Sequence, residues 1–73
     1  MAEELERDVE KNYPVDQFVD KLRRLADCLE QGERFRIQVA GTRITVPAYP
    51  DISVEHERDA DGEELEFQLK WKP

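Results

Sequence analysis

The sequence has little of what most catalytic or metal centres are built from. Its 73 residues include one cysteine, one histidine and three glycines. A single cysteine excludes an intramolecular disulfide and fits a reducing cytoplasm, and one Cys with one His cannot supply the usual four ligands of a zinc site. The glycines stand alone at positions 32, 41 and 62, so the chain has no glycine-rich phosphate loop. We therefore expect no cofactor.

Long apolar runs and an excess of basic charge are also missing. The opening residues, MAEELERDVE, are acidic where a signal peptide needs a basic and then an apolar segment. No run approaches the roughly 18 apolar residues of a membrane span. The net charge is −7, whereas nucleic acids and anionic membranes are bound by concentrated Lys and Arg. We expect a cytoplasmic protein with neither partner. An acid-rich surface adapted to a cytoplasm of high salt is a second interpretation of this charge.

What the chain does have is clear periodicity, first of the helical kind. A helix is predicted over about 14–31, because its apolar residues form a stripe roughly 120° wide. Pro14 suits a first helical position, and Gly32 suits a C-terminal cap. The stripe consists of Val15, Phe18, Val19, Leu22, Leu25, Ala26 and Leu29.

A period of two follows the helix and predicts strands at about 34–40, 42–47, 51–58 and 63–72. Pro47 and Pro50 bracket a loop because neither can donate a ladder hydrogen bond. Asp61–Gly62 suits the last hairpin turn. The segment at about 4–12 suggests an extra strand at the edge of the sheet.

These elements predict a single α+β domain over residues 1–73. The simplest arrangement places the helix across one face of an antiparallel meander of four strands. The last strand, LEFQLKWKP, alternates strictly and puts the only tryptophan on the apolar face. The expected core anchors are Phe18, Leu22, Leu25, Phe35, Ile37, Phe67, Leu69 and Trp71.

The order of these motifs resembles a known family. An amphipathic helix, a strand ending in Thr45-Val46-Pro47, an acidic turn and the final ELEFQLKWKP are similar to the Amphi-Trp domain of small archaeal and bacterial proteins. The resemblance covers about Leu5 to Trp71. It implies this fold, and because the family has no established biochemical activity it assigns no catalytic residues. One departure is Tyr13–Pro14, where a Ser or Thr helix cap is expected.

Reactive side chains are few and badly placed for catalysis. The candidate nucleophiles are Ser53, Cys28, Thr42 and Thr45, and the only imidazole is His56. Ser53 and His56 lie three residues apart on one strand and therefore on opposite faces, so they cannot form a nucleophile and base pair. His56 is expected at the rim of the apolar face, and Cys28 on the flank of the helix stripe as a small hydrophobe. We expect no enzymatic activity.

The acidic turn ERDADGEE has some features of a calcium loop. Glu57, Asp59 and Asp61 would be the first ligands if Gly62 took the sixth position. The twelfth position would then be Gln68 in place of the bidentate Glu, and the flanks are strands. We interpret the segment as a solvated hairpin turn and expect no metal site.

Charged residues alternate onto the outer face of the predicted sheet. The simplest interpretation is that these residues form solvated cross-strand pairs. The more specific interpretation is that they form a recognition surface for a charged partner. Its members would be Arg34, Arg36, Arg43, Glu64, Glu66 and Lys70. The favoured hypothesis is a small non-enzymatic interaction or accessory protein that binds a second copy of itself, as a homodimer, or another protein. The alternative is a ligand- or ion-binding module that uses the charged outer sheet face.

Overall fold

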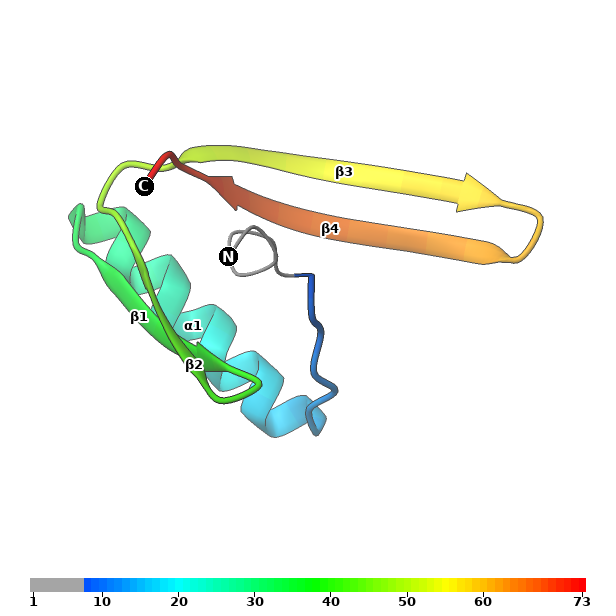
Figure 1. The fold of residues 1–73 in the computed structure, drawn as a ribbon, viewed down its shortest axis with the longest axis horizontal. Helices are drawn as coiled ribbons and strands as arrows, with labels where there is room; N and C mark the ends of the chain where they lie inside the picture. Colours follow the sequence, from blue (N-terminus) through cyan, green and yellow to red (C-terminus); the bar gives the residue numbers. More distant parts are fainter. Residues whose placement is uncertain (1–7) are drawn as a thin grey trace, which may run out of the picture.

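The computed structural model describes residues 8–73. Within that range the chain forms a helix, α1 (Val15–Gln31), followed by four strands, β1 (Phe35–Val39), β2 (Thr42–Val46), β3 (Asp51–Asp59) and β4 (Gly62–Lys70) (Figure 1). This order of helix and antiparallel strands confirms the α+β class. The expected N-terminal strand falls partly on residues 1–7, outside the described residues, and residues 8–14 form no strand.

Helix α1 begins without a side-chain cap and ends in a well-formed one. Its N-cap is Pro14, whose side chain makes no cap hydrogen bond, as the Tyr13–Pro14 departure implied. At the other end Gly32 adopts the left-handed conformation at φ 67°. The Gly32 and Glu33 amides donate to the carbonyls of Leu29 and Cys28 at 3.3 and 2.8 Å, respectively. This pairing is the Schellman motif, which satisfies carbonyls that the helix leaves open.

We expect Gly32→Ala to destabilise the protein by about 1–2 kcal/mol, because a Cβ at this φ meets the following carbonyl oxygen. The added Cβ would also lie 2.6 Å from the Tyr49 hydroxyl oxygen. Gly62→Ala is the matched control, because its φ is not in the left-handed region and its Cβ would meet nothing within 4 Å. Urea denaturation measures both. Equal losses for the two variants would contradict a role for the left-handed cap.

The first two strands form a short hairpin that packs beside the helix. In the antiparallel register Phe35 pairs with Val46 and Val39 with Thr42. Ala40 and Gly41 make the turn with φ of 47° and 84°, the conformation that the right-handed twist of a tight hairpin requires. The guanidinium of Arg24 in α1 joins the two elements. Its Nη2 donates to the Arg36 carbonyl at 2.8 Å, and its Cζ lies 5.2 Å from the centre of the Phe35 ring.

Strands β3 and β4 form a second, longer hairpin that extends away from the rest of the chain (Figure 1). We call this hairpin the arm, and α1 with the hairpin β1–β2 the base. The two hairpins are separate two-stranded sheets, which corrects the expectation of one four-stranded meander. Pro47 and Pro50 lie between β2 and β3. Because proline cannot donate to a ladder, this segment leads the chain away from β2 before β3 begins.

The resulting molecule is open and has a very small core. Among residues 8–73, only Phe35 and Val46 are buried apolar side chains. The Cα radius of gyration is 13.9 Å, against about 11 Å for a compact domain of this length. The chain exposes 6849 Å², whereas a folded monomer of 8.6 kDa exposes about 4,700 Å². In the described part of the chain, α1 lacks the length and apolar character that a membrane-crossing helix needs.

Candidate interaction surface

One face of the arm is apolar and exposed. The register aligns Ile52 with Leu69, Val54 with Phe67 and His56 with Leu65, and all six side chains share this face. We call it the apolar arm face. Phe67 is 67% exposed, and Ile52, Val54 and Leu65 are exposed to a similar extent. On the opposite face Glu55, Glu66 and Gln68 are half-buried. The arm therefore shows an inverted burial pattern, with its apolar side chains turned to solvent.

The apolar stripe of α1 is also largely uncovered. The helix meets the hairpin β1–β2 with the flank that carries Lys21 and Arg24. The first half of the stripe is consequently exposed, with Phe18 at 53%. We call this part the open helix stripe. It consists of Val15, Phe18, Val19 and Leu22.

The apolar arm face and the helix stripe meet where the arm leaves the base. Leu25 and Leu29 of α1 lie across a depression of about 340 Å³ from Ile52, Val54, Phe67 and Leu69, and its lining is almost entirely apolar. A second hollow of about 680 Å³ is lined by the apolar side of hairpin β1–β2 together with Leu25 and Trp71, among others. No side chain of residues 8–73 fills either hollow, so among the described residues the apolar surface is continuous from the helix to the arm.

These observations correct part of the expected core. Phe35 is buried, and Leu25, Ile37 and Leu69 are half-buried. Phe18, Leu22, Phe67 and Trp71 are exposed in the single chain, with Trp71 at 40% just beyond the end of β4. The expectation was wrong for these four because it assumed that the helix lies on the last strand. In the structure the arm diverges from the helix, and no other described element covers either surface.

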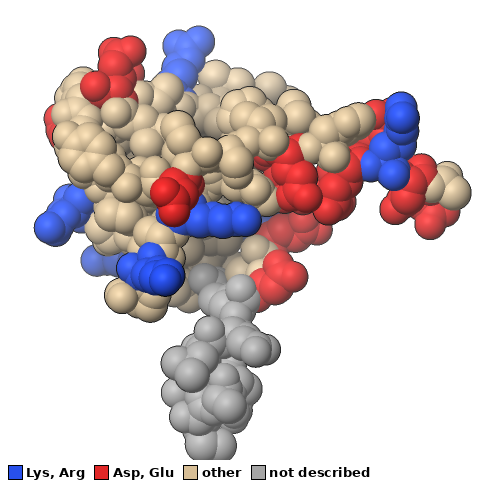
Figure 2. All heavy atoms as spheres, turned by 90° about the horizontal axis from the view of Figure 1, so that it is seen from above, with Lys and Arg blue, Asp and Glu red and all other residues tan. Residues whose placement is uncertain are grey.

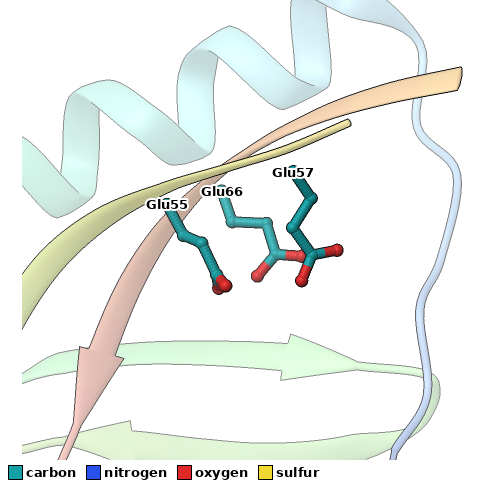
Figure 3. A group of neighbouring side chains, drawn as sticks. All are labelled: Glu55, Glu57 and Glu66. Atoms are coloured by element: carbon teal, nitrogen blue, oxygen red, sulfur yellow. The ribbon is translucent and has the colours of Figure 1, made fainter. Parts of the chain in front are cut away.

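The polar face of the arm carries a cluster of three carboxylates. Glu55, Glu57 and Glu66 project from the same face of β3 and β4, and one oxygen of each lies within 4.8 Å of the others (Figure 3). The amide Nε2 of Gln68 donates to Glu55 at 2.8 Å and to Glu66 at 3.2 Å. Two like-charged pairs, Glu55 with Glu66 and Glu57 with Glu64, stand directly opposite each other in the register. Such pairs are destabilising, and the Gln68 amide contacts only the first of them.

Glu64 shows the effect of this crowding. A hydrogen bond with Glu66, and then repulsion from the Glu66 and Glu57 carboxylates, raise the pKa of Glu64 above its ordinary value of 4.5. The folded chain therefore binds this proton more tightly than the unfolded chain does. It follows that the contribution of Glu64 to stability falls as the pH rises through its folded pKa, and is most favourable below 4.5.

We expect Glu64→Gln to be more stable than the parent protein at pH 7, and this advantage to disappear below pH 4.5, where the parent carboxyl is itself protonated. Urea midpoints at pH 7 and pH 4 measure the difference. Glu30→Gln, on the helix and outside the arm, is the matched control for loss of one carboxylate. An advantage that is the same at both pH values would contradict the assignment.

A basic concavity lies on the other hairpin. Lys21 and Arg24 of α1, Arg36 of β1 and Arg43 of β2 line a shallow depression of about 560 Å³, and among the described residues no carboxylate lines it. The Nζ of Lys21 also lies 4.6 Å from the centre of the Tyr13 ring. Figure 2 shows acidic side chains gathered toward the arm and most basic ones toward the base. Acidic side chains therefore dominate the arm, whereas the base carries charges of both signs.

This geometry divides the recognition surface that was expected on the outer sheet face between the base and the arm. Arg36 and Arg43 line the basic concavity, and Arg34 precedes β1. Glu64 and Glu66 lie on the arm, and Lys70 ends β4 opposite Asp51. The structure thus brings the six together only as two separate pairs, Arg36 with Arg43 on the base and Glu64 with Glu66 on the arm. The sequence did not indicate Lys21 and Arg24 as members of this surface, since helical periodicity places them outside the stripe but does not show which flank meets the hairpin.

The remaining polar candidates are occupied by local contacts. Ser53 Oγ donates to Gln68 Oε1 at 2.9 Å, and His56 Nε2 lies 2.9 Å from Glu63 Oε2 at the far end of the apolar arm face. In the acidic turn the Asp59 Oδ1 accepts the amides of Asp61 and Gly62 at 2.8 and 3.1 Å. This carboxylate therefore caps the turn. Ser53 and His56 each pair with a different neighbour, so the geometry offers no nucleophile and base pair there.

Comparison with known proteins gives one match. The family model described as the Amphi-Trp domain matches residues 1–73. No curated protein matches the chain, and no solved structure matches it either.

Proposed function

The chain belongs to the Amphi-Trp domain family, and from its uncovered apolar surfaces we propose that it is a small non-enzymatic interaction protein that acts as a homodimer. The observation that carries this proposal is the inverted burial of the arm. Val54, Leu65 and Phe67 are exposed while Glu55 and Glu66 on the opposite face are half-buried. Exposed apolar surfaces of this extent mark sites of protein association.

The size of the open surface supports association with a partner. The chain exposes about 2,100 Å² more than a compact monomer of its mass does. A standard protein interface takes about 800 Å² from each partner, so the excess is enough for a large interface. Two buried apolar side chains are also a small core for residues 8–73, and covering the open surface would add the missing hydrophobic stabilisation.

Sedimentation equilibrium and light scattering test this proposal. We expect twice the monomer mass of 8.6 kDa, and a thermal midpoint that rises with protein concentration because folding and association are coupled. Each chain carries a charge of −7, so the measurement is made at about 0.1 M and about 1 M salt, where screening differs strongly. A mass of one chain in both buffers, with a midpoint independent of concentration, would overturn the proposal.

The basic concavity supports a second candidate function, the binding of a small anionic ligand. Four cationic side chains surround about 560 Å³ on a protein whose net charge is −7. Concentrated cationic donors of this kind bind phosphate and carboxylate groups. Titration with inorganic phosphate, followed by backbone amide shifts, tests this function. Shifts near Lys21 and Arg36 that vanish in Arg36→Glu and Arg43→Glu, but persist in the arm control Arg58→Glu, would support it, and their absence would exclude it.

A further inference from the structure

Residues 8–73 carry two apolar surfaces of different shape that no described element covers. The apolar arm face is one side of a two-stranded hairpin, and the open helix stripe runs along one side of α1. A helix ridge packed on the face of a sheet is a standard layer arrangement in folded proteins. Among the described residues the two surfaces approach each other at the depression lined by Leu25 and Leu29, and the arm then extends away from the helix (Figure 1).

We propose that the arm of one chain lies across the open helix stripe of a second chain, and that the second arm does the same in return. This arm exchange rests on the homodimer proposed above and specifies its interface. Each chain would bury Val54, Leu65 and Phe67 against Phe18, Val19 and Leu22 of its partner copy. The predicted layer of one helix on one sheet face is then completed between two chains.

The dimensions of the two surfaces match. From Leu65 to Leu69 the arm face advances by four residues, or about 14 Å at the rise of a strand. From Val15 to Leu22 the helix advances by seven residues, or about 10 Å. The exposed half of the stripe is therefore as long as the apolar part of the arm, to within one helical turn.

Symmetry favours a second copy over a different protein. A twofold axis places the same two surfaces of each chain against each other, so that every arm finds a helix and every helix an arm. The excess area of about 2,100 Å² per chain, or about 4,200 Å² for two chains, lies within the total range that obligate homodimers bury. The linker with Pro47 and Pro50 lies between β2 and β3, at the position where such an exchange needs a hinge. Exchange of an identical element between two chains costs little free energy.

Isotope-filtered NOE spectroscopy on the unmodified protein tests the arm exchange. Labelled and unlabelled chains are mixed after unfolding and refolding, so that only contacts between chains give signals. We expect NOEs from the methyls of Val54 and Leu65 to those of Val19 and Leu22. A dimer whose intermolecular NOEs connect only arm to arm or helix to helix would overturn the arm exchange and leave the homodimer standing. A monomer would overturn both.

A mixing experiment provides a second readout. Leu22→Asp damages the helix stripe, and Val54→Asp damages the apolar arm face. A homodimer of either variant therefore has both of its arm–helix contacts broken. A mixture forms heterodimers with one intact contact. We therefore expect at least a tenfold lower apparent dissociation constant for the mixture than for either variant, with Ser53→Asp on the polar face remaining dimeric like the parent. Absence of recovery in the mixture, with both variants still showing helical circular dichroism, would contradict the arm exchange.

Discussion

The Phe35→Ala protein is expected to lose about 3–5 kcal/mol of unfolding free energy, the usual cost of truncating a buried aromatic side chain. Phe35 is 5% exposed, faces Val46 across the first hairpin and lies beneath the Arg24 guanidinium. Truncation would leave a cavity where the first hairpin packs against α1. A chain of this length has about 4–11 kcal/mol in total. Circular dichroism during urea denaturation should therefore show a much lower urea midpoint than that of the parent protein.

Two further substitutions serve as controls for Phe35→Ala. Tyr49→Ala removes an aromatic ring that is 86% exposed, and should cost less than about 1 kcal/mol because most surface substitutions lie within about 0.5 kcal/mol of zero. Phe35→Leu keeps an apolar group in the cavity and should fall between the two. If Phe35→Ala cost no more than Tyr49→Ala, the first hairpin would not be the folding core of the base.

The elements of this fold could be predicted because each has a distinct period. The stripe from Val15 to Leu29 has helical spacing, and residues from Phe35 to Lys70 alternate as strands do, so the helix and the four strands were expected close to where they occur. Gly32 was correctly expected as the C-terminal cap, because few other residues adopt φ 67° at low cost.

How the strands combine could not be predicted in the same way. Alternation shows that Val54 and Phe67 share one face, but a four-stranded meander and two separate hairpins have the same alternation. The choice depends on whether β2 and β3 pair, and the segment with Pro47 and Pro50 leads β3 away from β2. The expected burial of Phe18, Leu22, Phe67 and Trp71 failed for this reason.

The two charged regions could be predicted from the sequence to different degrees. The acidic face of the arm follows from strand parity, since Glu55, Glu57, Glu64 and Glu66 alternate with apolar residues. The basic concavity depends on how the flank of the helix meets the hairpin. That packing is fixed by the contact of Arg24 with the Arg36 carbonyl and the Phe35 ring, and no periodicity in the sequence specifies it.

The largest effect on association is expected for Phe67→Asp. Phe67 lies near the centre of the apolar arm face, opposite Val54, and is 67% exposed in the single chain. A charged group there costs little while the face is in water, but it must be desolvated without a partner if the face is covered. Central aromatic residues of interfaces contribute about 2 kcal/mol or more. We therefore expect the dissociation constant of the dimer to rise about 30-fold or more, as measured by sedimentation equilibrium.

Ser53→Asp is the matched control for this variant. It adds the same charge to the same hairpin one residue from Val54, but on the polar face beside Gln68. Because that face is not part of the proposed interface, the dissociation constant should change by less than about threefold, an effect of added long-range repulsion alone. If both variants weakened the dimer equally, charge and not apolar contact would control association. The interface would then lie on a sheet edge or on the polar face, with the inverted burial of the arm left to some other partner.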